Sequence, residues 1–502
     1  MIVLERHDQL DLEAYRRVVA EREPVEIGAA AERHVDMRRR ALEEYLASGA
    51  PAYGVTTGLG YLTHRPVPAE DRLALQRSIL VGRAAGVGEP LPEEVVRGAM
   101  LLRLTGFLSG DAAVTPQLCR FIAERLNDGW WPAVPEVRPG TAGETIQLCH
   151  LFQTFIGEGD VLVAGERVPA GEALERLGVP PYELRLKEGL ALVNGAPLAP
   201  ALAAALAQRA ELLLDQATLL GALAAALVAA PARPWSPRIG RLKGDPGQQR
   251  VHARLDELSG GEPPEDGPQP PVSMRVLPQV HGAAHDQLGH LVAQLERELR
   301  AVTDSPLYLA AEGDEPEGLY PSGNFHSQAL SICLDALAIA LAQVAGLSEK
   351  RLHRLLDSRF SGLPEQLSPG PDQGQCGVVA LHKAVVGLCA ENRMLATPAS
   401  VGASDTSSGQ EDFQAFTALA AGKLGRLLDN LELGLAYELV ALRQGRELST
   451  VTLSPALAAA IDSAASEIDA MTCDRSLAPD VERARELIAS GDLMPSAPIR
   501  RT

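Results

Sequence analysis

Several side chains in this sequence are of types that bind or activate a small charged substrate. Tyr53 opens a loop, residues 53–60, with three glycines, and glycine permits the close approach and unusual dihedrals of a loop that covers a substrate. The planar guanidinium of Arg275 suits a carboxylate, the amide of Asn194 can hold polar atoms, and the carboxylate of Glu411 attracts a cationic nitrogen. Core packing, a surface ion pair and a turn are the alternative roles of the tyrosine, the arginine and the asparagine.

Long apolar segments must position these side chains. Most apolar residues are Ala and Leu, with few aromatic residues, which favours helix over strand. Long helices are expected at residues 198–230, 287–300, 327–357, 378–395 and 411–442. Segments of helix-breaking residues interrupt them at 231–237, 260–271 and 361–374. The sequence therefore predicts an all-α fold, with an α-rich N-terminal domain at residues 1–195 and a long-helix bundle at residues 196–502.

Composition restricts the partners and the location. The net charge of −19 argues against nucleic acid or an anionic membrane as partner, since both need a basic surface. Charged and polar residues interrupt the apolar segment 198–230, so a buried helix is expected there and not a membrane span. Six scattered cysteines without a CxxC pair indicate reduced thiols and no metal site, and residues 1–24 lack the apolar core of a secretory signal. We therefore expect a cytoplasmic protein with a small-molecule substrate.

Seven segments follow one another in the order known from one enzyme family. They are residues 53–60, 83–90, 140–144, 188–195, 273–282, 322–326 and 410–412. In this order the chain resembles the aromatic amino acid lyases, which comprise histidine, phenylalanine and tyrosine ammonia-lyases and related aminomutases. The resemblance implies the long-helix bundle of the aspartase and ammonia-lyase type. It also implies a homotetramer whose active sites draw residues from several subunits.

The resemblance implies chemical roles at the reacting carbon and at the amine. Tyr53 matches the general base, which removes a weakly acidic proton from the carbon beside the one that bears nitrogen. Gln410 and Glu411 match positions near the amine, where a carboxylate attracts a cationic nitrogen whether or not it transfers protons.

The resemblance also implies contacts with the rest of the substrate. Arg275 matches the residue that binds the substrate carboxylate. Asn194 and Asn324 match asparagines that could hold the same carboxylate or the reacting region. Phe325 is expected to pack against the substrate or the core and to take no part in the chemistry.

The segment that builds the family's prosthetic group departs from the family pattern. The family's Ala-Ser-Gly tripeptide cyclises and loses two waters, one of them the serine hydroxyl, to form the electrophile methylidene-imidazolone. Here the tripeptide is Thr141-Ala142-Gly143, whose central residue has no hydroxyl. Thr141 cannot substitute, because the methylidene must form on the central residue. We therefore expect neither this prosthetic group nor another cofactor.

Two positions of the substrate pocket depart from the pattern as well. Histidine ammonia-lyases carry a histidine at the position of Arg83, and an arginine would suit an anionic or strongly accepting group at the far end of the substrate. Lys383, on a predicted helix, could add to this charge, although a solvated lysine is commoner. Val272 stands where ammonia-lyases usually carry a tyrosine, three residues before the arginine, which makes the amine end less polar.

These departures together suggest a carbon–nitrogen lyase whose substrate carries a leaving group that needs no electrophile. A quaternary trimethylammonium group leaves as neutral trimethylamine, as in the ergothionase branch of the family, which converts ergothioneine to thiolurocanate. Three alternatives stay open. They are another elimination, addition or cyclisation on a natural-product precursor, a non-catalytic homologue that binds a small acidic ligand or an active partner subunit, and an engineered serine-to-alanine variant of an ammonia-lyase.

Overall fold

The computed structural model describes residues 1–260, 269–370 and 374–493 of the chain. These residues form two compact units. Unit 1 comprises Met1–Ala205, Val292–Ile332 and Ala399–Ala421, and unit 2 comprises Leu206–Leu291, Cys333–Pro398 and the chain from Gly422 onward. The contiguous pair of domains expected from the sequence, 1–195 and 196–502, differs from these units. The reason is that two later segments return to the N-terminal part of the chain.

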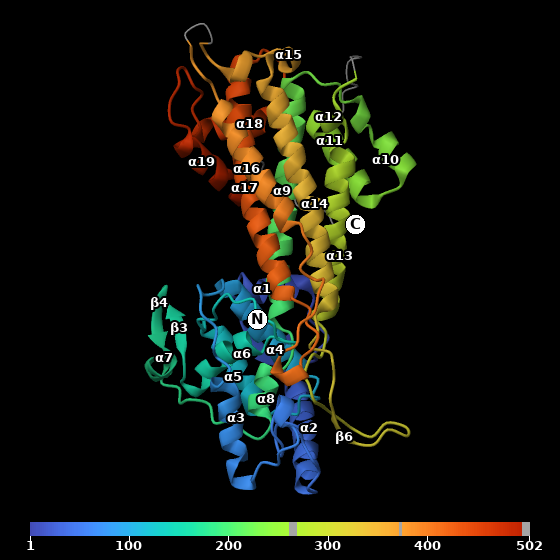
Figure 1. Ribbon diagram of the computed structural model, residues 1–502, viewed down its shortest axis with the longest axis vertical. Helices are drawn as coiled ribbons and strands as arrows, with labels where there is room; N and C mark the ends of the chain where they lie inside the picture. Colours follow the sequence, from blue (N-terminus) through green and yellow to red (C-terminus); the bar gives the residue numbers. More distant parts are fainter. Residues whose placement is uncertain (261–268, 371–373, 494–502) are drawn as a thin grey trace. The chain divides into compact units, whose positions relative to one another are not determined.

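Unit 1 is mainly helical and also contains three small sheets (Figure 1). Its helices are α1 (Leu12–Val19), α2 (Ala29–Ala47), α3 (Arg72–Val81), α4 (Glu93–Phe107), α5 (Pro116–Asn127), α6 (Thr145–Phe152), α7 (Ala170–Leu177) and α8 (Glu188–Val193). Each sheet has two strands: β1 (Ile2–Leu4) pairs in parallel with β2 (Val25–Ile27), β3 (Asp160–Val163) antiparallel with β4 (Glu166–Pro169), and β5 (Leu307–Leu309) antiparallel with β6 (Gly318–Tyr320).

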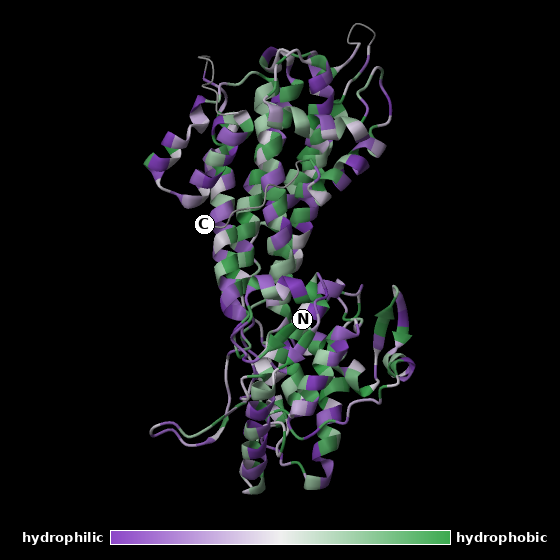
Figure 2. Cartoon of the chain, turned by 180° about the vertical axis from the view of Figure 1, so that it is seen from behind, coloured by the Kyte–Doolittle hydropathy of each residue, from purple (hydrophilic) through white to green (hydrophobic). Residues whose placement is uncertain are grey.

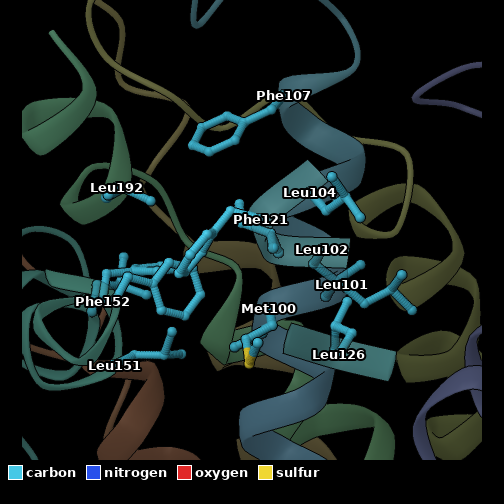
Figure 3. Packing of buried hydrophobic residues seen from close by; sticks show 14 of the residues in the cluster. Met100, Leu101, Leu102, Leu104, Phe107, Phe121, Leu126, Leu151, Phe152 and Leu192 are labelled. Carbon is cyan, nitrogen blue, oxygen red and sulfur yellow. The ribbon is translucent and has the colours of Figure 1, made fainter. Parts of the chain in front are cut away.

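The core of unit 1 lies between α4, α5, α6 and α8. Side chains from all four helices meet there, among them Phe107, Phe121, Phe152 and Leu192 (Figure 3). Phe121 and Phe152 each pack a ring edge or tilted face against Phe155, with ring centroids 5.2 and 5.3 Å apart, a favoured aromatic geometry. This packing fixes the helices whose ends carry the residues singled out in the sequence.

Unit 2 consists of long helices with shorter ones around them. Its shorter helices are α10 (Pro237–Lys243), α11 (Pro246–Ser259), α12 (Val272–Arg275), α15 (Ser358–Ser361), α16 (Val379–Leu395), α18 (Pro455–Glu467) and α19 (Ala478–Ser490). Four long helices have residues in both units: α9 (Leu198–Leu227), α13 (Leu277–Glu298), α14 (Gln328–Leu356) and α17 (Thr417–Leu448). Apolar residues run along these long helices (Figure 2). The predicted all-α, long-helix fold is confirmed.

One predicted helix starts later than expected. The sequence indicated a helix from residue 411, but α17 starts at Thr417. Glu411 instead pairs with Thr406 in an isolated bridge, and Phe416 has φ of 50°, which an α-helix does not allow. Part of the predicted loop at 260–271 lies outside the described residues.

Two helical stretches, Glu188–Leu227 and α14, are long and apolar enough to cross a membrane by length and composition alone. In their most apolar windows 72% and 56% of the residues are buried inside the protein. Burial of this kind is typical of helices that are apolar on most faces and lie inside a helical assembly.

Candidate active site

Three helices of unit 1 carry the polar segments at their ends. α3, α6 and α8 pack on one another (Figure 1). α3 ends just before Arg83, α6 begins just after the tripeptide 141–143, and α8 ends just before Asn194. Close approach is built into this packing, since a Cβ atom on Gly189 of α8 would lie 2.2 Å from the carbonyl oxygen of Gln76 in α3. The core therefore fixes three of the predicted segments relative to one another.

The degenerate tripeptide is held by a carboxylate from a distant part of the sequence. The backbone N–H of Ala142 donates a hydrogen bond to Oε2 of Glu411 at 2.8 Å. The hydroxyl of Ser407 donates to Oε1 of the same carboxylate at 2.9 Å. The hydroxyl of Thr141 donates to the carbonyl oxygen of Gly143 at 2.5 Å. Each oxygen of Glu411 thus accepts a hydrogen bond, which fixes the orientation of this carboxyl group beside Ala142.

The residues at the tripeptide do not fit the family's prosthetic group. The side chain of Ala142 is a methyl group, which has no water to lose. The only hydroxyl of the tripeptide belongs to Thr141 and is bonded to Gly143 O. No step of the chemistry is therefore assigned to a methylidene-imidazolone.

Tyr53 lies in a loop that packs beside the Glu411 segment. Its phenol oxygen accepts a hydrogen bond from the N–H of Gly60 at 2.9 Å, and its side chain is partly accessible to solvent. The short helix η1 (Gly60–Leu62) contacts η7 (Ser407–Gly409), so the loops of Tyr53 and Glu411 are neighbours. The hydrogen bond from Gly60 fixes the position of the phenol oxygen.

A buried amide ties the Tyr53 loop to α8. The Nε2 group of Gln76, which is fully buried, donates to Gly54 O at 2.8 Å. Its Oε1 atom accepts from the N–H of Leu190 at 3.2 Å. One side chain thereby links the loop that carries Tyr53 with the helix that ends at Asn194.

The two predicted asparagines use part of their amides to hold the backbone. Nδ2 of Asn194 donates to Ser305 O at 2.7 Å, and Nδ2 of Asn324 donates to Val302 O at 3.1 Å. Each amide has two N–H donors and one carbonyl acceptor, so each side chain keeps a second N–H for a ligand. Phe325 lies near the tripeptide, because a Cβ atom on Gly143 would lie 3.6 Å from that of Phe325.

Arg83 lies in the loop that follows α3 and is exposed to solvent. A histidine of α6 anchors this loop. Nε2 of His150 in α6 accepts the N–H of Gly86 at 2.9 Å. Burial and the nearby Arg167 lower the pKa of His150, which favours the neutral ring that can accept a hydrogen bond. The loop also pairs with the strand-like segment before the tripeptide, since Leu91 N–H donates to Val134 O at 2.8 Å.

Glu144 anchors the tripeptide to the first turn of α9. Its two carboxyl oxygens accept the N–H groups of Leu198 and Ala199, both at 2.6 Å. A helix N-terminus has free N–H groups and favours an anion. Desolvation nevertheless raises the pKa of this carboxyl to about 8, while the two N–H groups and Arg103 lower it. Glu144 also borders a small cavity beneath the tripeptide.

In unit 2, Arg275 opens into a separate cavity of about 360 Å³. Its guanidinium donates to the side-chain oxygen of Gln269, with Nη2 at 3.2 Å, once that amide is oriented to accept. Its Nε atom is buried without a partner among the described residues. A buried donor without a partner costs free energy, so this side chain is suited to an anionic ligand.

The other predicted site residues are accessible to solvent. Val272 is 59% exposed at the start of α12. Lys383 is exposed on α16, and Gln410 is exposed beside Glu411. Their proposed contacts with substrate stay predictions. Within the described ranges, no group of three or more His, Cys, Asp or Glu side chains could hold a metal ion.

Several residues that shape the site were missed in the sequence. Ser407 bonds Glu411, four residues away. Gln76 bonds Gly54, 22 residues away, and His150 bonds Gly86, 64 residues away. Gln269 sits at the edge of a segment rich in Pro and Gly. None of them has a spacing or composition signal of its own, so only a structure could reveal them.

The sequence pattern of the aromatic amino acid lyases matches residues 10–466. The chain belongs to this family. Histidine ammonia-lyase from Symbiobacterium thermophilum is 36% identical over 460 residues, which cover 90% of each protein. This aromatic amino acid lyase is therefore placed among carbon–nitrogen lyases related to the ammonia-lyases.

Solved structures of two relatives share its fold closely. Tyrosine aminomutase from Streptomyces globisporus is 29% identical, with 98% of this chain and 97% of that one covered and a TM-score of 0.90. The ergothioneine-degrading enzyme ergothionase from Treponema denticola is 26% identical, with 99% and 100% covered and a TM-score of 0.93. Fold alone does not fix the reaction, so the site must decide between them.

Proposed function

We propose that this lyase eliminates trimethylamine from a betaine amino acid, with ergothioneine as substrate and thiolurocanate as product. The observation that carries the proposal is Ala142 at the centre of the tripeptide. Ammonia is a poor leaving group, and the family's electrophile exists to capture the amine. A quaternary nitrogen cannot attack an electrophile and departs as a neutral amine, so its substrate makes the electrophile redundant.

The proposed reaction is a base-promoted β-elimination. The phenolate of Tyr53 takes a proton from the carbon next to the one that bears nitrogen. The electrons of that C–H bond form a carbon–carbon double bond, and the electrons of the C–N bond leave with trimethylamine. The products are a neutral amine, an unsaturated carboxylate and a protonated Tyr53. The N–H of Gly60, 2.9 Å from the phenol oxygen, holds that oxygen in place for the transfer.

The nitrogen end of the substrate is assigned to the Glu411 segment. Hydrogen bonds from Ala142 N–H and Ser407 hydroxyl hold the carboxylate in one orientation. A carboxylate attracts a trimethylammonium group without any N–H to bond. From their motif positions alone, Val272 of unit 2 is assigned to the methyl groups and Gln410 of unit 1 to the nitrogen.

Asn194 and Asn324, both in unit 1, are assigned to the substrate carboxylate, and Arg275 in unit 2 is assigned to it from its motif alone. The Arg275 guanidinium lies in a cavity and has an unpartnered Nε, and its planar fork suits a carboxylate. Each asparagine retains one amide N–H beyond the one that bonds the backbone. Phe325 would pack against the substrate.

The ring end is assigned to Arg83. A thiolate-like sulfur on the imidazole would accept a charge-assisted hydrogen bond from its guanidinium. Lys383, which lies in unit 2, is assigned to the ring from the sequence alone. The likeness to ergothionase, an enzyme solved in complex with desmethyl-ergothioneine sulfonic acid, supports this choice of ring.

We also propose that the enzyme is a cytoplasmic homotetramer with active sites shared between subunits and no nucleic-acid or membrane partner. Tyr53, Arg83, Asn324 and Gln410 are all exposed in the single chain. A site that excludes water needs a cover over these residues, and a second copy of the chain would supply it.

A second function has support from the relatives. Histidine ammonia-lyases reach 36% identity with this chain, which favours ammonia release from histidine. The Ala142 methyl group opposes it. Both reactions can be followed in one assay, because they release different amines and give products with different absorbance.

The Arg83→His variant tests the assignment of substrate. The enzyme is expected to convert ergothioneine to thiolurocanate with one trimethylamine per product. Arg83→His should lower the preference for ergothioneine over histidine betaine by about ten- to a hundredfold, because a charge-assisted hydrogen bond contributes about 1.5–3 kcal/mol. It should not produce ammonia from histidine.

The competing role of Arg83 is a structural ion pair. In that case Arg83→His would lower the melting temperature and leave the ratio of the two substrates unchanged. An unchanged ratio removes ergothioneine as the assigned substrate. Rapid ammonia release from histidine by the unaltered enzyme would overturn the proposed function itself.

A further inference from the structure

A buried ion cluster in unit 1 consists of Arg103, Lys187 and Asp304, and none of these residues is assigned to the substrate. Nη2 of Arg103 donates to Oδ1 of Asp304 at 2.9 Å, and Nζ of Lys187 donates to Oδ2 at 3.0 Å. The three side chains are at most 3% exposed. Such a cluster adds little net stability compared with apolar side chains, because desolvation offsets most of the attraction. Its contribution is expected to be geometric.

The backbone around Asp304 holds both asparagines of the proposed site. Ser305 O accepts Nδ2 of Asn194 at 2.7 Å, and Val302 O accepts Nδ2 of Asn324 at 3.1 Å. The hydroxyl of Thr303 accepts the N–H of Ala196 at 3.1 Å. Four consecutive residues, 302–305, therefore connect to the segments of Asn194 and Asn324.

The loop before Asn324 is bound to the same four residues. The hydroxyl of Ser322 donates to Asp304 O at 2.8 Å, and the N–H of Ser322 donates to the hydroxyl of Ser305 at 3.1 Å. The Ser322 hydroxyl also accepts the N–H of Asn324 at 3.3 Å. Displacement of Asp304 would thus move the backbone on which Asn324 is placed.

Helix α8 is tied to this segment at both of its ends. Lys187 is its N-cap, with φ of 72°, and Asn194 is its C-cap. Lys187 bonds the Asp304 carboxylate and Ala112 O, while Asn194 bonds Ser305 O. A helix of six residues with both ends fixed on consecutive residues has little freedom to shift.

We propose that Asp304, which is bonded by Arg103 and Lys187, is a positioning residue. It orients the remaining N–H groups of the Asn194 and Asn324 amides so that they bind the substrate carboxylate. This inference rests on the proposed function, which assigns those asparagines to the carboxylate. It adds a residue with no matching motif and no contact with substrate. Its effect is on binding, since the asparagines hold a group that does not react.

Lys187→Met is the test variant, because it removes one cation and leaves a balanced Arg103–Asp304 pair. Lys423→Met is a matched control. Nζ of Lys423 also bonds a buried carboxylate, Asp335, at 2.8 Å and a backbone carbonyl, but its partners lie outside the 302–305 segment. Thermal melting measures the stability that each variant loses, so that an effect on the site can be separated from a general loss of stability.

Lys187→Met should raise KM for the betaine substrate about tenfold, the scale of one partly lost hydrogen bond to a charged group. The value of kcat should change less than about threefold. Amide hydrogen exchange should accelerate at residues 194–196 and 322–324. Lys423→Met should change neither KM nor the exchange of these residues.

Equal KM values for the two variants, with unchanged exchange at both asparagine segments, would overturn the positioning role. Amide hydrogen exchange tests the positioning role even if the enzyme shows no activity. If the unaltered enzyme converts no betaine, the proposed function fails. Faster exchange in Lys187→Met alone would then still establish Asp304 as the anchor of the two segments.

Discussion

At the scale of single residues, the chemistry depends on what surrounds Ala142. Its methyl group cannot supply the hydroxyl that the family's electrophile needs, and its N–H is bonded to Glu411 at 2.8 Å. Glu411, whose carboxylate can attract a cation, is therefore beside Ala142. Tyr53 accepts an N–H from Gly60, and its loop contacts that of Glu411. An elimination that needs a base but no electrophile is consistent with this set.

Replacement of Tyr53 by Phe tests the base. Only one hydroxyl is removed, so the enzyme should fold and its melting temperature should fall little, with one N–H at Gly60 losing its acceptor. Turnover of ergothioneine should drop at least about a hundredfold, the contribution typical of a positioned acid–base group. Initial rates of trimethylamine release give the answer. Full activity in a folded Tyr53→Phe enzyme would assign the proton to another residue.

The sequence predicted the types and order of the site residues but not their partners. The motifs singled out Ala142 and Glu411 separately, and the structure joins the two residues by a hydrogen bond across 269 positions. They could not show that Asn194 spends one N–H on Ser305, 111 positions away. Contacts of this range depend on the packed core, which no local pattern encodes.

At the scale of elements, helices were predicted better than their ends. The apolar run from residue 198 gives α9, Leu198–Leu227, because Ala and Leu favour helix and burial. The start of α17 was wrong by six residues, since the positive φ of Phe416 and the bridge at Glu411 override helix propensity. This error matters, because the extended segment is what brings Glu411 to Ala142.

The Glu144 contact with α9 predicts a dependence of stability on pH. The folded pKa of this carboxyl is raised to about 8 from 4.5, so between these values the folded state holds a proton that the unfolded state has released. The stability contribution is present below about pH 4.5 and is lost as pH rises through 8. Relative to Glu144→Gln, the free energy of unfolding should fall by at most about 1.4 kcal/mol per pH unit.

Urea unfolding of both proteins at several pH values between 5 and 8 measures this difference. The glutamine keeps one oxygen for the N–H groups of Leu198 and Ala199 but does not titrate. A difference between the two proteins that stays constant with pH would show that Glu144 is ionised throughout, held by α9 and Arg103.

At the scale of the whole molecule, family membership was predictable because seven segments keep their order along most of the chain. The long-helix fold followed from composition and from that order. The two compact units did not, because segments 292–332 and 399–421 join unit 1 only through tertiary contacts. The substrate is not fixed at this scale, since relatives with the same fold include an ammonia-lyase, an aminomutase and ergothionase.

The ratio of amines released from a matched pair of substrates tests the central claim most directly. Histidine betaine and histidine share ring and carboxylate and differ in whether the nitrogen is methylated. Supplied together at equal concentration to enzyme whose intact mass matches the sequence, they should give trimethylamine in excess over ammonia by more than about a hundredfold. That ratio corresponds to roughly 3 kcal/mol between the two barriers. Ammonia in equal or greater amount would contradict an electrophile-free lyase that depends on a quaternary leaving group.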